Sequence, residues 1–190
     1  MISVPLDRKT IEDMIDGKLD KRELYKIIAG RKDPERFKMV IEIFQSRVKW
    51  KEKILLPLSE HLFIVNKNGK PIVKCSCGYE FGDYRINWKF KARVFVRDTR
   101  ETIEEIYKKY MGSHPDWMEL REYYCPGCYT LLEVEAVPPG YPVLFDFLPD
   151  LKTLYEDWLG EKLPCEDVKF EDKSIDYLKE EIMKKKPTKV

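Results

Sequence analysis

The first 50 residues have the pattern of short helices separated by turn residues. Asp20 and Glu23 have the spacing of a helix capping box, and Gly30 suits a helix end. The dipeptide Asp33-Pro34 predicts the N-cap and first residue of a third helix. Apolar residues recur on one face of this helix, at Phe37, Val40, Ile41, Phe44 and Val48. We expect this face to dock, on the core of the same chain by preference or else on another chain.

The pattern changes to β-strands from residue 61 onward. Two β-rich runs within residues 62–75 flank Asn68-Gly69, a dipeptide typical of a two-residue hairpin. Residues 87–97 then alternate between apolar and mostly cationic side chains, which predicts a half-buried strand with a cationic outer face. The apolar positions are Trp88, Phe90, Ala92, Val94 and Val96, and the alternate positions are Lys89, Lys91, Arg93, Phe95 and Arg97.

The second half of the chain combines helices, strands and one irregular segment. Residues 98–111 predict an amphipathic helix, and residues 121–137 predict two strands joined by a turn. The apolar side of that helix carries Ile103, Ile106, Tyr107 and Tyr110. Residues 138–149 are rich in proline and aromatic residues, which indicates an extended arm without regular structure. A short helix over 150–160 and a terminal helix that frays into a basic end complete the chain.

These elements predict an α+β fold, with N-terminal helices followed by an antiparallel β module that has helical insertions. We expect a single domain overall. Within it, residues 1–50 form a helical segment, residues 51–163 form the β-rich core with the arm, and residues 164–190 form a helical extension.

The amino-acid composition argues against several functional classes for this chain. The 190 residues include 35 Lys plus Arg and 34 Asp plus Glu, so the chain lacks the basic excess that nucleic-acid binding normally needs. One Gln and three Asn beside many Lys and Glu resemble the composition of thermophile proteins. No apolar run is long enough to span a bilayer and no signal peptide is recognisable, so we expect a cytoplasmic protein with no membrane contact.

Four of the five cysteines form two closely spaced pairs, Cys75-Ser-Cys77 and Cys125-Pro-Gly-Cys128. Structural zinc binds four thiolates at about 2.3 Å in a tetrahedron, which places the sulfurs about 3.8 Å apart and favours ligand pairs on tight turns. Gly78 and the Pro-Gly of the second pair suit such turns. The sequence therefore predicts a zinc-stapled β module, with a redox dithiol or an iron site as alternatives.

The sequence gives little sign of catalysis by this chain. Four cysteine ligands would leave no open position on the metal for water or substrate. His61 and His114 lie in no metalloprotease-like motif, and we interpret them as surface or capping residues. Cys165 lies beyond the last core helix and is interpreted as a free thiol. No phosphate-binding glycine loop or serine-hydrolase elbow occurs in the chain.

An ordered series of motifs over about residues 10–160 resembles the small gamma subunit of the acetone carboxylases. The series includes GRKDPERF, CSCGYEFGDYRINWK, ARVFVRDT, LREYYCPGC, YPVLFDFLPD and YEDWLG. The resemblance implies a non-catalytic subunit of a ligase complex whose zinc ligands are Cys75, Cys77, Cys125 and Cys128. The tail after about residue 163, which includes Cys165, is longer than the family pattern.

The resemblance further implies partners and cofactors. It places the chain in an α2β2γ2 assembly with two large hydantoinase-like subunits, alpha and beta, which form acetoacetate from acetone and bicarbonate. ATP and Mn²⁺ would belong to those partner subunits only. Two other functions stay open on the residues alone: a zinc-ribbon module that binds nucleic acid or protein, with Lys89, Lys91, Arg93 and Arg97 as its cationic face, and a stand-alone metalloenzyme.

Overall fold

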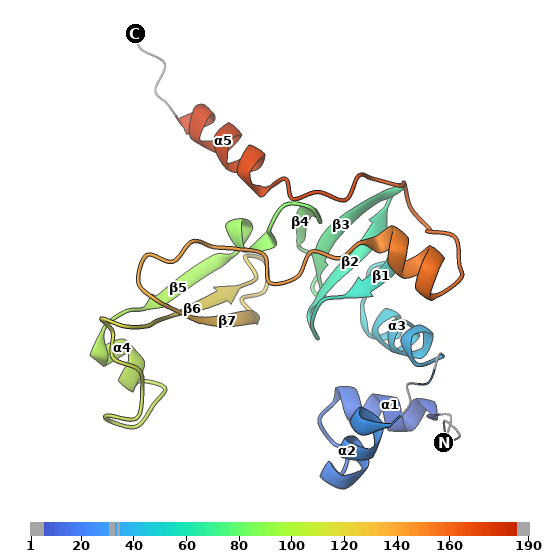
Figure 1. Ribbon diagram of the computed structural model, residues 1–190, viewed down its shortest axis with the longest axis horizontal. Helices are drawn as coiled ribbons and strands as arrows, with labels where there is room; N and C mark the ends of the chain where they lie inside the picture. The colour runs from blue at the N-terminus through green and yellow to red at the C-terminus, as the bar shows by residue number, and fades with distance from the viewer. Residues whose placement is uncertain (1–5, 31–32, 34, 186–190) are drawn as a thin grey trace.

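The computed structural model describes residues 6–30, 33 and 35–185, and it has the expected α+β fold (Figure 1). Two antiparallel sheets lie beside each other. The first has four strands in chain order: β1 (Lys53–Pro57), β2 (Leu62–Lys67), β3 (Lys70–Cys75) and β4 (Glu80–Asp83). The second has three strands in chain order: β5 (Arg93–Arg97), β6 (Glu119–Tyr124) and β7 (Leu131–Val137).

Three helices precede the sheets, as the sequence predicted: α1 (Arg8–Ile15), α2 (Lys21–Ala29) and α3 (Arg36–Arg47). Asp20 caps α2, because its side chain accepts a hydrogen bond from the amide of Arg22. The predicted cap of α3 was wrong by two residues, since Glu35 occupies the N-cap position. Asp33 instead accepts the Glu35 amide at 3.0 Å, and Pro34 lies outside the described residues.

The apolar face of α3 packs on the first sheet, which confirms the preferred docking on the chain's own core. Phe44 is buried against Phe63 of β2, with the two rings in an edge-to-face arrangement at 5.3 Å. Val40, Ile41 and Val48 pack partly buried on the same cluster. This burial fixes the helix on one face of the first sheet.

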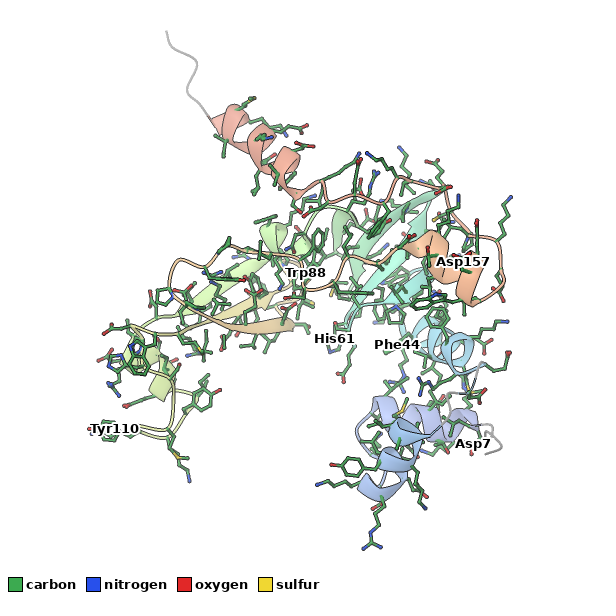
Figure 2. All side chains as sticks on the ribbon, viewed as in Figure 1. Asp7, Phe44, His61, Trp88, Tyr110 and Asp157 are labelled. Carbon is green, nitrogen blue, oxygen red and sulfur yellow. The ribbon has the colours of Figure 1, made fainter. Side chains whose placement is uncertain are left out.

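A second core cluster joins the two sheets. Trp88 lies where they meet (Figure 2), with its ring 5.7 Å from that of Phe81 in β4 and 5.9 Å from that of Tyr123 in β6. Cys75 and Cys125 belong to this same cluster and are fully buried. The cluster between the sheets therefore includes aromatic rings and thiol groups among its aliphatic side chains.

The predicted strand over 87–97 is correct only in its second half. Residues Trp88–Lys91 form a 3-10 helix, η1, and only Arg93–Arg97 is a strand. Asn87 caps η1 by accepting the Lys89 amide at 3.1 Å, and Lys89 turns inward, where it is 2% exposed. The expected cationic face is therefore wrong at Lys89, because its ammonium group turns toward the carboxylates of Glu133, Glu135 and Asp146. Strands β1 and β4 were not predicted.

The predicted helix over 98–111 is much shorter in the structure. Helix α4 spans Arg100–Glu104, and Thr99 caps it in a reciprocal arrangement with Thr102. Ile103 is buried, whereas Tyr107 and Tyr110 are exposed. A short helix owes most of its stability to packing, and this one has packing for a single apolar residue, so it ends early.

The remaining predictions of secondary structure hold within the described residues, and the predicted basic end, residues 186–190, lies outside them. Residues 138–149 contain no helix or strand, and the hairpin at Asn68-Gly69 forms with positive φ at both residues. The helical turn after Asp150 continues as a π-helix, η2 (Thr153–Trp158), and Tyr155 donates a hydrogen bond to Leu55 O at 2.9 Å. The terminal helix α5 spans Ser174–Lys185. Among the described residues, no helix has both the length and the apolar character needed to cross a membrane.

Candidate metal centre

The four paired cysteines come together where the two sheets meet. Cys75 ends β3, and Cys125 follows β6 directly. Their sulfur atoms, with those of Cys77 and Cys128, all lie within 4.8 Å of one another. Cys75 Sγ lies 3.8 Å from Cys128 Sγ, and Cys77 Sγ lies 3.7 Å from Cys125 Sγ.

This arrangement fits a tetrahedral metal ion. Four thiolates at the usual zinc–sulfur distance of about 2.3 Å have their sulfurs about 3.8 Å apart, close to both short distances observed. Cys75 and Cys125 are fully buried, whereas Cys77 and Cys128 reach the surface. The donor set is all sulfur, which suits zinc and excludes hard cations such as Mg²⁺ from this site.

Tight turns aim both cysteine pairs at this point. Gly78 adopts φ 102° and donates its amide to Cys75 O at 2.8 Å, which closes the first turn. In the second turn the Gly127 amide lies 3.4 Å from Cys125 Sγ and donates toward it. A Cβ at Gly127 would lie 3.1 Å from Tyr79 Cβ and 3.5 Å from Cys77 Sγ, so glycine keeps the two turns close.

Two residues outside the motifs hold the first turn. Trp50 Nε1 donates to the carbonyl oxygens of Cys75 and Ser76, both at 3.2 Å. The Ser76 amide donates to His61 O at 2.9 Å, and His61 Nδ1 lies 3.3 Å from Ser76 Oγ. His61 lies at the surface, as the sequence predicted, and also supports this turn. Neither that contact nor the role of Trp50 was predicted. An aromatic residue just before a strand is a common pattern, so the sequence did not indicate that Trp50 holds the cysteine turn.

The electrostatics of the thiols differ between buried and exposed positions. Burial raises the pKa of Cys75 and of Cys125 above the usual thiol value. Burial acts in the same direction on Cys128, but hydrogen bonds from the Thr130 hydroxyl and amide outweigh it and lower the pKa of Cys128 to about 7. A metal ion bound here would therefore displace protons from the two buried thiols.

The comparison with known proteins decides the family. Residues 48–159, which include all four paired cysteines, match the model for the acetone carboxylase gamma subunit. The chain belongs to the acetone carboxylase gamma subunit family. It is 48% identical over 159 residues to the acetone carboxylase gamma subunit of Xanthobacter autotrophicus, covering 83% of this chain and 95% of that protein. It is also 31% identical over 80 residues to the acetophenone carboxylase beta subunit of Aromatoleum aromaticum, covering 41% of this chain and 62% of that protein.

A second polar cluster in this gamma-family chain surrounds Lys89. Its Nζ lies 2.6 Å from Glu133 Oε1 and 2.5 Å from Glu135 Oε1, and it also pairs with Asp146 of the arm. Burial disfavours the charged ammonium, but the three carboxylates outweigh burial and raise the pKa of Lys89. The Lys89 ammonium therefore occupies the position that a metal ion would take among these carboxylates. Glu133 and Glu135, on one face of β7, were a signal that the sequence analysis did not use.

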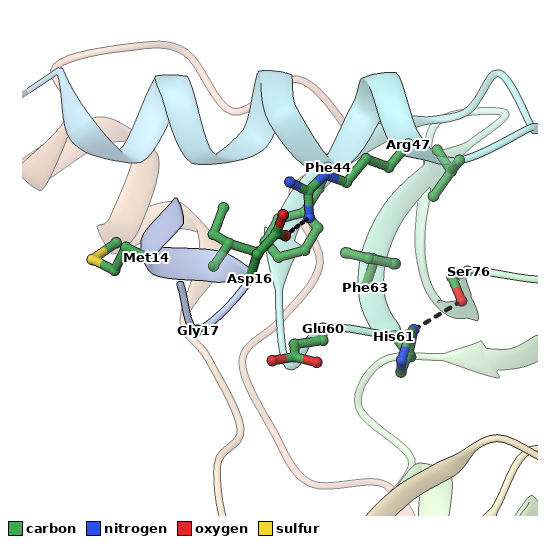
Figure 3. Close-up of a pocket in the computed structure, with 11 residues that line it drawn as sticks. Met14, Asp16, Gly17, Phe44, Arg47, Glu60, His61, Phe63 and Ser76 are labelled. Atoms are coloured by element: carbon green, nitrogen blue, oxygen red, sulfur yellow. Dashed lines mark hydrogen bonds and ion pairs between the residues drawn. The ribbon is translucent and has the colours of Figure 1, made fainter. Parts of the chain in front are cut away.

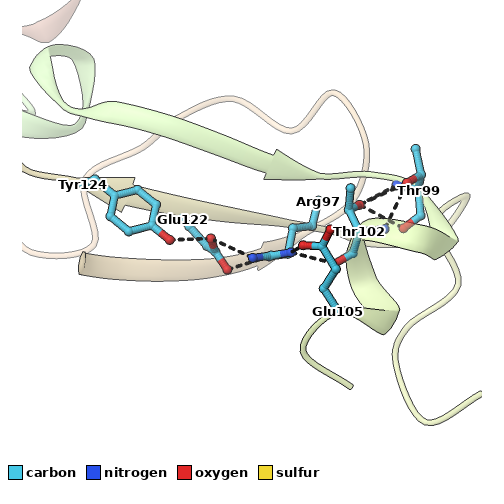
Figure 4. Close-up of polar contacts among 6 residues, drawn as sticks. All are labelled: Arg97, Thr99, Thr102, Glu105, Glu122 and Tyr124. Carbon is cyan, nitrogen blue, oxygen red and sulfur yellow. Dashed lines mark hydrogen bonds and ion pairs between the residues drawn. The ribbon is translucent and has the colours of Figure 1, made fainter. Parts of the chain in front are cut away.

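Two of the cationic residues expected to form one face, Lys89 and Arg97, are paired with carboxylates in the structure. Arg97 Nε lies 2.7 Å from Glu122 Oε1 and Arg97 Nη1 lies 2.6 Å from Glu105 Oε2 (Figure 4). The Arg97 guanidinium holds the pKa of the Glu122 carboxyl below its usual value. With Lys89 buried as well, the surface proposed for nucleic acid does not form as a continuous cationic face.

A cleft of about 500 Å³ lies between α1, α3 and the turn before β2 (Figure 3). Phe44 and Phe63 contribute to its apolar lining. Asp16 and Arg47 form an ion pair at its edge, at 2.7 Å, and His61 lies opposite beside Ser76. In the described part of the chain no carboxylate is bonded to His61, so this Ser–His pair lacks the third group that orients a catalytic histidine.

Proposed function

We propose that this chain is a non-catalytic, zinc-binding gamma subunit of an ATP-dependent ketone carboxylase. In this complex it supports the assembly of large alpha and beta subunits, which form acetoacetate from acetone and bicarbonate. The observation that carries the proposal is the cluster of four cysteine sulfurs within 4.8 Å of one another, in a chain of this family. The 48% identity to an acetone carboxylase gamma subunit supports acetone as the ketone.

Zinc would act as a structural link between the two sheets. Cys75 and Cys77 extend from the first sheet, and Cys125 and Cys128 lie in the turn of the second. A zinc ion held by these four thiolates would supply binding energy that appears as folding energy. The four sulfurs would complete its coordination, so it would hold the β-rich core, residues 51–163, in a fixed shape for partner contacts.

The chemistry of carboxylation would belong to the partners. In the proposed α2β2γ2 assembly, ATP and Mn²⁺ bind to the large subunits. The contribution of this chain is to bind and orient those subunits through the surfaces that its rigid sheets present. The helical segment of residues 1–50 and the extension of residues 164–190 would add contacts at either side of the core.

Isolation of the intact complex tests the partner assignment. The chain is tagged in its native cells, purified gently, and its companions are identified and quantified by mass spectrometry. Two large hydantoinase-like chains in amounts equal to the tagged chain are expected. Recovery of the chain alone, or with nucleic acid that is released at 200 mM salt, would contradict the proposal.

Cobalt substitution tests the metal assignment. Co²⁺ in a tetrahedral four-thiolate site gives intense sulfur-to-metal absorption, and its spectrum should not change when small anions are added. A spectrum that responds to added anions would reveal an open coordination position. That result would favour a metalloenzyme over a structural site.

A further inference from the structure

Strand β5 is an exposed apolar edge of the second sheet. It lies at the end of the strand order β5-β6-β7 and pairs with β6 on one side. Its central residues Val94, Phe95 and Val96 are 46%, 42% and 36% exposed. Successive side chains of a strand point to opposite faces, so apolar groups are exposed on both faces of this edge.

The other sheet edges carry register irregularities, whereas β5 does not. Natural proteins shield edge strands with bulges, covering segments or charges, because free N–H and C=O groups recruit other strands. Register irregularities interrupt the pairing of β1 with β2, of β3 with β4 and of β6 with β7. The arm also lines a cleft together with β7. Within the described residues, β5 alone among the edge strands pairs in unbroken register, from Arg93 to Arg97.

We propose that an extended segment of a large carboxylase subunit pairs with β5 and becomes the fourth strand of the second sheet. This inference rests on the proposed function, since it names the surface through which this subunit would bind a partner. Main-chain hydrogen bonds would supply affinity, and alternate side chains of the added strand would supply specificity.

The exposure pattern favours a strand over other occupants. A helix or a flat surface docked on one face would cover either Phe95 or the two valines, but not all three. An added strand places side chains beside β5 on both faces. A second copy of β5 fits less well as the occupant. The five residues read Arg-Val-Phe-Val-Arg in both directions, so in an antiparallel pair each residue faces its own type. Antiparallel pairing of two copies over all five residues would set Arg93 directly opposite Arg97 of the other copy, and facing like charges are destabilising.

Charge complementarity defines the partner strand further. Arg93 is exposed and, among the described residues, has no ion pair. Its guanidinium lies 5.1 Å from the centre of the Tyr129 ring. We therefore expect an acidic side chain in the partner strand next to Arg93. Tyr129 directly follows Cys128, so the proposed metal centre holds one end of this edge in place.

Hydrogen exchange measured by mass spectrometry tests the strand pairing. The full chain is compared alone and in the complex with both large subunits. Exchange in the peptide covering residues 93–97 should slow about tenfold or more in the complex, since amides that pointed to solvent become bonded. Strand β1 is the internal control, because it is also an edge strand but its Ile54 and Leu55 are already buried.

The charge is tested with Arg93→Glu and a charge-reversal control, Lys108→Glu, at an exposed position outside the segments proposed to contact the partners. Arg93→Glu should weaken binding of the large subunits about tenfold, while Lys108→Glu leaves it unchanged. A complex that forms without slower exchange over 93–97 would overturn the strand pairing and leave the proposed function intact. If the large subunits do not bind the wild-type chain at all, the proposed function and this inference both fail.

Discussion

Cys75 Sγ lies 3.8 Å from Cys128 Sγ, although 53 positions separate the two residues in the chain. Cys77 and Cys125, which are 48 positions apart, have the same relationship at 3.7 Å. Both short contacts therefore run from one sheet to the other. A metal ion at this point would cross-link the sheets, and its removal would weaken their contact as well as the turns.

Cys125→Ser should abolish stoichiometric zinc binding. The variant loses one ligand that is fully buried and leaves three thiols without a complete coordination sphere. We expect less than one zinc per ten chains by elemental analysis, against about one per chain in the wild type, with a large fall in Tm. Cys165→Ser is the control and should keep its zinc. A folded Cys125→Ser variant with unchanged Tm would rule out a structural role for the metal.

Trp50→Phe should loosen the first cysteine turn. The indole N–H donates to the carbonyl oxygens of Cys75 and Ser76, and phenylalanine cannot donate. A loss of about 1 to 2 kcal/mol in the free energy of unfolding is expected, with faster zinc transfer to a chelator. Trp158→Phe serves as the matched control, since Trp158 is 77% exposed. Equal zinc release rates in the two variants would show that Trp50 does not hold the turn.

Lys89→Met should destabilise the second sheet and the arm. It removes the buried ammonium that pairs with Glu133, Glu135 and Asp146, and three carboxylates would then face one another. Urea unfolding should show a loss of about 3 kcal/mol. Lys91→Met, in which no ion pair is lost among the described residues, should cost less than about 1 kcal/mol. Similar losses in both variants would refute the special role of Lys89.

The protein should lose stability as pH rises from about 10 to about 12. Burial raises the pKa of Tyr84 and of Tyr155 to about 12, above the ordinary value near 10. In this pH range the folded state keeps protons that the unfolded state has released, so the free energy of unfolding falls as pH increases. Below pH 10 both states are protonated, and the contribution is complete.

Tyr155→Phe isolates this effect. The variant loses the hydrogen bond to Leu55 O, so it should be about 1 kcal/mol less stable at pH 8. Its stability should then decline less steeply than that of the wild type between pH 10 and 12. Urea unfolding at several pH values, with tyrosinate absorbance at 295 nm, measures both slopes. Parallel pH profiles would show that Tyr155 does not titrate with a raised pKa.

The sequence by itself determined the features that depend on near neighbours. The capping residue of α2 and the Asn68-Gly69 hairpin follow from side chains and φ preferences within a few positions, and both form as predicted. The two cysteine pairs lie on tight turns for the same reason, since glycine permits the backbone to close around each pair. The family motifs are also a property of the sequence alone.

Only the tertiary structure decided the features that depend on distant partners. Residues 88–91 alternate like a strand, yet they form a 3-10 helix because Lys89 pairs with carboxylates from β7 and the arm. Arg97 pairs with Glu122 for the same physical reason: a charge shielded from water needs an opposite charge, which here lies elsewhere in the chain. The free edge of β5 likewise follows from strand order, which local patterns do not encode.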